Sequence, residues 1–224
     1  MSRLILIFGQ SGAGKSYSLK TLDPNKTLII DADKKGALCW RGWKKDYTSK
    51  NFSSVNSLDV IKNSIDKVGK DEKFSHITTL VIDGISNAFS TFEATYMDRF
   101  NPKNNFEPYQ KLKSKAVNIF DTAKDQRDDL NVIFIGNVKL ADPYQPGSVD
   151  RLLVPGNYLK ENQPEANFNY VFYAKIIDGE HVFETFPNKS AAKSPEGCFP
   201  EIIQNDLAYV INIIDAYERG DNFA

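Results

Sequence analysis

The stretch that decides the fold reads Gly9-Gln10-Ser11-Gly12-Ala13-Gly14-Lys15-Ser16. It fits the P-loop pattern, in which a glycine and four further residues are followed by Gly-Lys-Ser. The apolar residues 4–8 come directly before it and indicate a buried strand, so the glycines stand where a strand hands over to a helix. At such a turn several backbone N–H groups point into one concavity and hold polyphosphate. The sequence therefore predicts a nucleotide site formed by residues 9–16 and Tyr17.

Two side chains of this loop have separate expected roles. Lys15 would reach the β- and γ-phosphates of ATP, and the Ser16 hydroxyl would ligate Mg²⁺. We expect the Lys15 ammonium to face solvent when no nucleotide is bound. The alternative interpretation is an ordinary glycine-rich strand–helix turn, and the strand before the motif argues against it.

Acidic residues follow two further predicted strands. Residues 77–83 form an apolar run that ends in Asp83, and we expect this strand to neighbour the P-loop strand and Asp83 to be a second Mg²⁺ ligand. Residues 27–31 form a second apolar run that is predicted to be a strand. Asp33 follows it and is predicted to orient the attacking water. Asp31 is the next candidate for that role. The competing interpretations are a turn-forming Asp-Gly at Asp83 and loop capping by the other two acids.

A fourth strand, residues 131–136, leads into Asn137. A side-chain amide at that position could sense the γ-phosphate and pass the signal to the segment that follows. The alternative is an asparagine that only forms a turn.

The alternation of strands and helical patterns predicts an α/β fold with a mainly parallel sheet, organised as one domain over residues 1–224. Two more strands joined by Asp178-Gly179 indicate a C-terminal β-hairpin over 168–177 and 181–186. A long irregular connection is expected at 138–167. The predicted helices cover residues 15–22, 58–69, 85–99, 108–128 and 205–218.

Composition restricts the class of protein. The net charge of −1 gives no global signal for nucleic acid, and no apolar run approaches transmembrane length, so no membrane partner is expected. Cys39 and Cys198 are expected to be buried, reduced thiols of a cytoplasmic protein. His76 and His181 are isolated, and positions in solvent or core are favoured over roles as ligand or base.

A local basic stretch could still contact DNA. Cations for phosphates alternate there with rings that could stack on bases: Lys34, Lys35, Trp40, Arg41, Trp43, Lys44 and Lys45. The alternative is a solvated charged loop whose two tryptophans are anchored in the core.

The order of these motifs resembles the RecA-like recombinase core, and more closely the short phage ATP-binding proteins that consist of that core alone and are associated with single-strand annealing. The resemblance rests on residues 9–16, on Ile30-Asp31-Ala32-Asp33 where relatives often show Ile-Asp-Thr-Glu, on residues 81–84 and on residues 135–138. It implies a Mg²⁺-dependent ATPase that is stimulated by single-stranded DNA, in the host cytoplasm if a phage encodes it.

The same resemblance implies how subunits and DNA would be contacted. Lys189 and Lys193 resemble basic residues that reach the ATP of a neighbouring subunit in filament-forming relatives, so a homo-oligomer is expected. The connection at 138–167, with its cations Lys139, Arg151 and Lys160, would be the DNA-contacting segment.

Two other classes of function stay open. A small P-loop nucleotide kinase usually carries several arginines in a phosphate-clamping lid, whereas residues 138–167 hold only Arg151. A nucleotide-dependent assembly protein with negligible turnover would use the same loop. A GTPase is disfavoured because neither residues 25–28 nor residues 188–191 complete the Asn-Lys-x-Asp pattern.

Overall fold

A computed structural model describes residues 1–97, 107–155 and 163–221. Its sheet has the strand order β3-β2-β4-β5-β1-β7-β8-β9, with β6 added to β5. The pairs from β3 across to β7 are parallel, and β8 and β9 continue the sheet in antiparallel fashion. This confirms an α/β P-loop fold with a mainly parallel sheet and a C-terminal hairpin. The strands are β1 (Arg3–Gly9), β2 (Thr27–Asp31), β3 (Phe52–Ser54), β4 (Thr79–Asp83), β5 (Asn131–Lys139), β6 (Arg151–Leu152), β7 (Tyr170–Ile177), β8 (Glu180–Glu184) and β9 (Ile202–Gln204).

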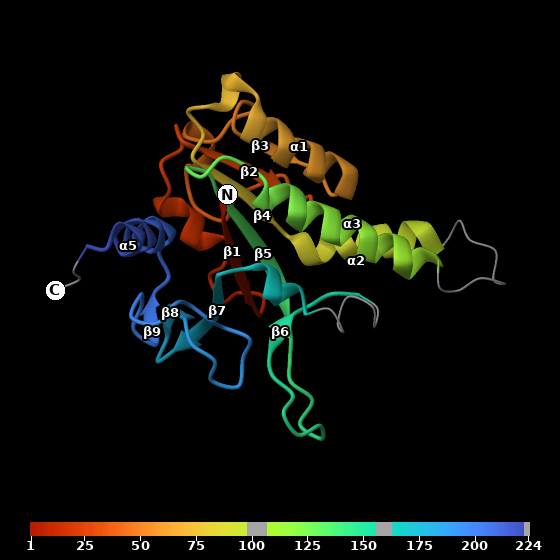
Figure 1. The fold of residues 1–224 in the computed structure, drawn as a ribbon, viewed down its shortest axis with the longest axis vertical. Helices are drawn as coiled ribbons and strands as arrows, with labels where there is room; N and C mark the ends of the chain where they lie inside the picture. The colour runs from red at the N-terminus through yellow and green to blue at the C-terminus, as the bar shows by residue number, and fades with distance from the viewer. Residues whose placement is uncertain (98–106, 156–162, 222–224) are drawn as a thin grey trace.

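Helices cover both faces of this sheet (Figure 1). The helices α1, α2 and α3 gather on one face, and α5 lies on the other with the short 3₁₀ helix η1. Their bounds are α1 (Leu58–Lys70), α2 (Ile85–Met97), α3 (Glu107–Lys124), α5 (Leu207–Arg219), η1 (Tyr17–Thr21), η2 (Trp43–Lys45), η3 (Glu72–Phe74) and η4 (Pro164–Asn167). The expected helix at 85–99 is therefore found up to Met97, and its last two residues lie outside the described residues.

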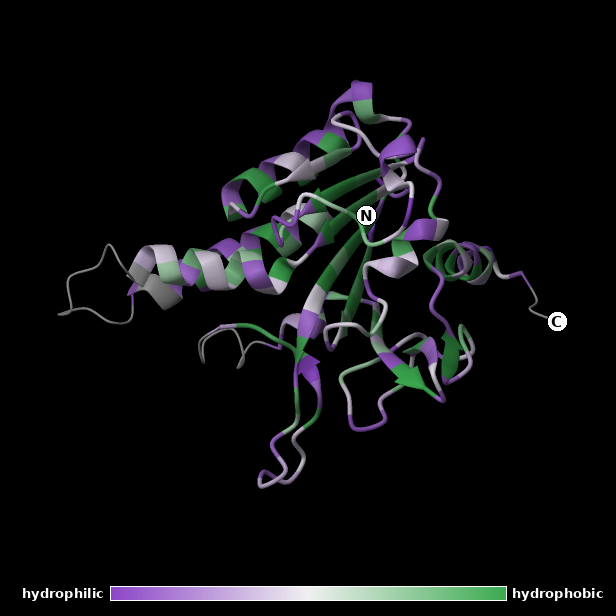
Figure 2. Cartoon of the chain, turned by 180° about the vertical axis from the view of Figure 1, so that it is seen from behind, coloured by the Kyte–Doolittle hydropathy of each residue, from purple (hydrophilic) through white to green (hydrophobic). Residues whose placement is uncertain are grey.

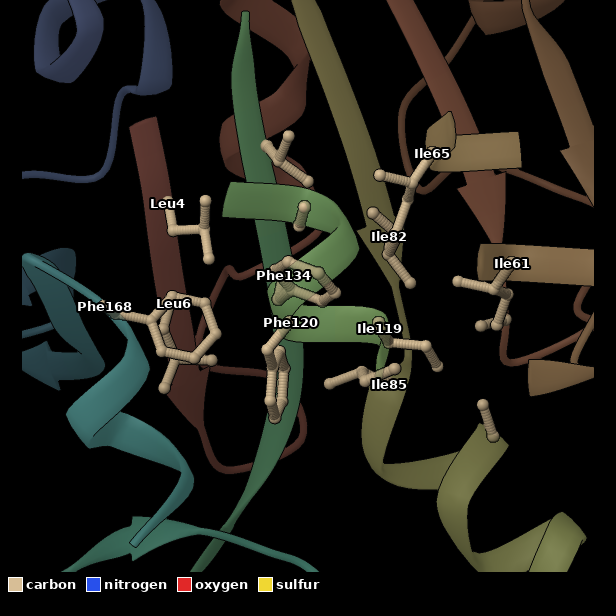
Figure 3. Close-up of a cluster of buried hydrophobic side chains, with 14 of the residues drawn as sticks. Leu4, Leu6, Ile61, Ile65, Ile82, Ile85, Ile119, Phe120, Phe134 and Phe168 are labelled. Atoms are coloured by element: carbon tan, nitrogen blue, oxygen red, sulfur yellow. The ribbon is translucent and has the colours of Figure 1, made fainter. Parts of the chain in front are cut away.

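The central strand β1 supplies side chains to both cores because successive residues of a strand point to opposite faces. Leu4, Leu6 and Phe8 join the cluster under α1–α3, whereas Ile5 and Ile7 join the cluster under α5. Figure 3 shows the first cluster, and Figure 2 shows the apolar strands inside their more polar helices. Burial of each such side chain contributes about 1.5–3 kcal/mol, which fixes the sheet on which the motif residues stand.

Strand register brings the motif residues to one edge of the sheet. Gly9 on β1 pairs with Asn137 on β5, and Asp31 on β2 pairs with Asp83 on β4. The strand β5 lies between β1 and β4, so the prediction that the Asp83 strand adjoins the P-loop strand is wrong. Long crossover connections between parallel strands let a later strand insert between two earlier ones. All these carboxyl ends still share an edge, which is where open α/β sheets bind ligands.

The segment after the P-loop is shorter than predicted. Instead of a helix over 15–22, only the 3₁₀ turn η1 forms, and Leu22 is already extended at φ −69° and ψ 144°. Pro24 follows two residues later and disfavours helical geometry at Asp23, so a helix could not continue beyond this point. The helix α3 also ends earlier than expected, at Lys124 rather than residue 128. The strands β3, β6 and β9 were not predicted, since two or three residues are too few to show a period.

The connection after β5 is an irregular loop with a short paired base. The strand β5 continues to Lys139, and β6 pairs with it antiparallel, so the expected irregular segment is regular at these two residue pairs and irregular between them. Figure 1 shows the loop between β5 and β6 projecting from the body of the molecule. Asp150 fixes its base, because it accepts hydrogen bonds from Ala141 N at 2.7 Å and from the Tyr173 hydroxyl at 2.8 Å. Lys160 lies outside the described residues.

Candidate functional site

A cavity of 330 Å³ opens at the carboxyl edge of the sheet. Its volume falls in the range of small-molecule sites. It brings together most of the residues predicted from sequence, because the P-loop and the ends of β2, β4 and β5 meet there. The lining residues are Ser11, Gly12, Gly14, Lys15, Ser16, Tyr17, Asp33, Lys35, Cys39, Asp83, Gly84, Ile135, Gly136, Asn137 and His181.

The Lys15 ammonium is held by its own loop. Its Nζ donates hydrogen bonds to the carbonyl oxygens of Gly9 and Gln10, each at 2.8 Å. Burial lowers the pKa of Lys15, while the nearby carboxylates of Asp83 and Asp33 oppose that shift. The side chain is half-buried, so the expectation that it faces solvent without nucleotide holds only in part. Because the carbonyls restrain the chain, the cation is already placed at the mouth of the phosphate-binding loop.

The side chains of Ser16 and Asp83 meet in the cavity. Both residues line the cavity, and burial raises the pKa of Asp83 to about 6 while the neighbouring Ser16 hydroxyl opposes that shift. Over residues 1–97, 107–155 and 163–221 there is no cluster of three or more His, Cys, Asp or Glu side chains suited to a metal. One hydroxyl and one carboxylate nevertheless fit Mg²⁺, which takes few protein ligands and completes its shell with phosphate and water oxygens. The residues present are thus suited to Mg²⁺ with a nucleotide.

Asp33 lies on the wall of the same cavity. Its Oδ2 accepts a hydrogen bond from Lys35 Nζ at 2.6 Å, in an ion pair whose lysine side chain is 66% exposed. Gly84 allows this arrangement, because a methyl group added there would collide with the Asp33 carboxylate, and its φ of +102° also favours glycine. The acid predicted to orient water therefore has access to the cavity, and Lys35 fixes one of its oxygens.

Asp31 has a different environment. Its Oδ2 accepts hydrogen bonds from Gly36 N at 2.7 Å and from Ser54 Oγ at 2.9 Å, and the residue is only 4% exposed. These contacts tie the loop after β2 to β3. The carboxylate is engaged in shaping that loop, as the capping interpretation expected.

The remaining predicted residues lie in the first cavity, in an adjoining hollow or in the core. Asn137 is exposed and lines the first cavity, and its backbone N–H donates to Ser86 Oγ at 3.0 Å. Gly9 and Gln10 line an adjoining hollow of 530 Å³ that also contains Asn137. Ala13 packs into the core beneath the loop and is 4% exposed.

The basic stretch after β2 has the cations but not the rings of a stacking surface. Trp40 is buried against Tyr47, and Trp43 packs on Phe52 at a centroid distance of 5.1 Å. Lys44 is exposed and extends over the Trp43 ring. Trp40 therefore anchors this loop, as the alternative interpretation expected, and Trp43 is half-buried against Phe52.

The two lysines expected to act on a neighbouring subunit differ in presentation. Lys189 is exposed, and its carbonyl oxygen accepts a hydrogen bond from Asp150 N at 2.9 Å. Lys193 is half-buried and pairs through its backbone with Val171, and burial lowers its pKa against the opposing charge of Glu165. Neither lysine lines the cavity.

Sequence reasoning missed three cavity residues. Cys39 was expected to be buried but is exposed and lines the cavity, whereas Cys198 is buried as expected, and both are free thiols. Lys35 was considered only for DNA contact, although its position two residues after Asp33 was a usable signal. His181 was expected in solvent or core and carries no motif that could have placed it here.

Comparison with known proteins agrees with this geometry. The AAA_24 family model, described as an AAA domain, matches residues 1–181. The chain belongs to this family. Membership makes this AAA domain a P-loop ATPase domain and implies nucleotide binding.

One similar solved structure is the flagellar accessory protein FlaH from Methanocaldococcus jannaschii, at 14% identity and a TM-score of 0.43, covering 90% of this chain and 83% of that chain. No curated protein matches the sequence. Within the ranges that the structure describes, none of the helices combines the length and apolar character needed to cross a bilayer.

Proposed function

We propose that this AAA domain is a Mg²⁺-dependent ATPase of phage or prophage type, which acts in DNA recombination or single-strand annealing in the host cytoplasm. The observation that carries the ATPase part is that the side chains of Lys15, Ser16 and Asp83 all line one cavity at the P-loop. The recombination part is supported by the order of the motifs, which resembles the core-only phage proteins.

Each cavity residue would have a separate role in hydrolysis. Lys15 would exchange its two carbonyl partners for phosphate oxygens and neutralise their charge. Ser16 and Asp83 would hold Mg²⁺, which when bound neutralises charge on the β- and γ-phosphates. Asp33 would orient and deprotonate the attacking water, with Lys35 fixing the direction of its carboxylate. Asn137 would contact the γ-phosphate from the end of β5.

Replacing Asp33 by asparagine should separate binding from chemistry. We expect kcat to fall by about 100-fold or more, because the general base is lost. The Kd for a Mg²⁺–ATP analogue should stay within about twofold, since Lys15, Ser16 and Asp83 are unchanged. Steady-state phosphate release and calorimetry would measure the two effects, with Asp46→Asn as an exposed-acid control on the same loop. Turnover at the wild-type rate in Asp33→Asn would show that another group positions the water.

Single-stranded DNA is the proposed partner, and the structure restricts how it would be held. Arg41, Lys44 and Lys45 are exposed on the loop that also supplies Lys35 to the cavity. Because Trp40 is buried and Trp43 packs on Phe52, we infer contact mainly through DNA phosphates rather than through stacked bases. Such contact is weak for one subunit and would gain affinity when several subunits present the patch in a row.

A homo-oligomer is the proposed assembly. Lys189 is the better placed of the two lysines to reach a neighbouring subunit's ATP, because its side chain is exposed while Lys193 is half-buried. In such an assembly, Lys44 and Lys45 would contact DNA and not ATP. Reversing their charge should therefore weaken DNA binding without changing ATP binding.

The test combines assembly, DNA binding and turnover. We expect a non-hydrolysable ATP analogue to promote oligomers in sedimentation, and these should bind labelled single-stranded oligonucleotides. The Lys44→Glu/Lys45→Glu variant should lose about tenfold or more in DNA affinity at low salt, and its salt dependence should be shallower by about two phosphate contacts. Lys26→Glu/Lys50→Glu, at the opposite edge of the sheet, is the matched control.

Three outcomes would redirect the proposal. A protein that stays monomeric with the analogue and binds no DNA at low salt would exclude the recombination role. Phosphoryl transfer to added nucleoside monophosphates would favour the kinase alternative. Nucleotide-promoted assembly without measurable hydrolysis, with or without DNA, would favour the assembly protein.

A further inference from the structure

The C-terminal segment folds back onto the P-loop. The family match ends at residue 181, so β9 and α5 lie beyond the matched stretch. The helix α5 packs against η1, and Ala208 N donates a hydrogen bond to Thr21 Oγ1 at 3.2 Å. This docking brings the turn before α5 next to the phosphate-binding loop.

Two side chains from this region meet the loop at Gly14. A methyl group built on Gly14 would lie 3.0 Å from His181 Nδ1 and 3.0 Å from Asn205 Nδ2. His181 comes from β8 and lines the same cavity as Lys15 and Ser16. Because Gly14 directly precedes Lys15, the imidazole lies beside the part of the loop that would hold phosphate.

The Asn205 amide lacks a partner. Its Nδ2 and Oδ1 are both buried, and neither makes a hydrogen bond within the part of the chain that the structure describes. A buried polar group without a partner costs free energy, so such a group indicates a function or a missing ligand. Here the amide lies beside an imidazole whose ring is exposed to the cavity.

We propose that His181 and Asn205 form a second wall of the nucleotide site, in which an imidazole N–H donates a hydrogen bond to the polyphosphate. Asn205 is the positioning residue, since its amide can hydrogen-bond the other ring nitrogen and fix the ring. This inference rests on the proposed nucleotide site, and it adds a contact made within one subunit from outside the P-loop.

The sequence provides its own control, because it contains two histidines. His181 is exposed in the cavity, and His76 is exposed in a separate hollow at the opposite edge of the sheet. The experiment treats the whole protein with diethyl pyrocarbonate and follows each histidine by peptide mass spectrometry. Probes are Mg²⁺ with a non-hydrolysable ATP analogue and Mg²⁺ with tripolyphosphate.

We expect either probe to slow modification of His181 by about fivefold or more, because the imidazole is then hydrogen-bonded to a phosphate oxygen and shielded from the reagent. The rate of modification of His76 should stay unchanged. Protection by the ATP analogue but not by tripolyphosphate would overturn the phosphate contact. Equal modification with and without probes, under conditions where calorimetry shows saturation, would overturn the whole inference.

Substitutions test the hydrogen bond itself. His181→Phe keeps a ring without a donor and should raise the Kd of the ATP analogue about tenfold, whereas His181→Gln keeps an N–H donor and should stay within about threefold. Asn205→Ala should weaken binding in wild type but add little in His181→Phe, and His76→Phe should change nothing. If the wild type binds in a Lys15-dependent way and His181→Phe binds equally well, the inference fails and the proposed function stands. If the wild type binds no nucleotide, the proposed function itself fails.

Discussion

Replacing Lys15 by alanine should raise the Kd of Mg²⁺–ATP by about 100-fold and lower turnover by about 1,000-fold. The ammonium now donates to two carbonyl oxygens of its own loop and is half-buried, so it is held where phosphate charge would accumulate. Without Lys15, the loop would bind phosphate through its backbone N–H groups alone, because residues 9–16 contain no other cation.

The fold should survive this change. Lys15 contributes two hydrogen bonds within its own loop and no side chain to either core cluster, so the free energy of unfolding should change by about 1 kcal/mol or less. The measurement is the thermal shift on adding Mg²⁺–ATP analogue, which saturating ligand should produce in the wild type and not in Lys15→Ala. Lys26→Ala, exposed at the opposite edge of the sheet, should keep the shift. Full ATPase activity in a folded Lys15→Ala protein would refute the site.

The P-loop and the acidic strand ends could be predicted because their signals are local. A glycine pattern after an apolar run indicates a sharp backbone turn at the end of a strand. A predicted strand that ends in aspartate indicates that a carboxylate lies at the edge of the sheet. Parallel pairing then collects these ends at one edge whatever the order of the strands. This is why Ser16 and Asp83 meet although β5, unforeseen in that position, separates β1 from β4.

Other features depend on contacts between distant segments. Trp40 and Trp43 lie among lysines in the sequence, and only the packing of their loop on Tyr47 and Phe52 shows that they are anchors. His181 reaches the cavity because of the β7–β8 hairpin, and Asn205 because α5 docks on η1. No hydrophobic period or motif in either segment predicts that these two side chains lie near the P-loop. The role of Lys35 could be predicted only in part, because its spacing from Asp33 permits the ion pair without requiring it.

The carboxylate of Asp83 should reveal a conflict between stability and function. Burial raises its pKa to about 6 from an ordinary value of 3.8. The native state therefore keeps this proton up to a higher pH than the unfolded chain does. Between about pH 4 and pH 6 the native state binds more protons, so the free energy of unfolding falls as pH rises through this window. Above about pH 6 the ionised Asp83 should cost the nucleotide-free protein about 2–3 kcal/mol.

Replacing Asp83 by asparagine should remove that cost and the metal site together. At pH 8 the nucleotide-free Asp83→Asn protein should be more stable than wild type by about 2 kcal/mol in urea unfolding, and near pH 4 the two should be nearly equal. Mg²⁺-dependent turnover should fall by about 100-fold or more, because the hydroxyl of Ser16 remains without the charged ligand that hard cations require. Asp33→Asn is the matched control, since it should lose turnover while keeping Mg²⁺-dependent nucleotide binding.

In the wild type, nucleotide binding that depends on Mg²⁺ should strengthen as pH rises towards about 6, because the metal requires the carboxylate and competes with its proton. Saturating Mg²⁺–ATP should move that transition to lower pH, since binding favours the ionised form. Asp83→Asn should show no such pH dependence. A variant that is less stable than wild type at pH 8 and still binds nucleotide with Mg²⁺ would contradict both roles. Asp83 would then serve the packing of β4 rather than the site.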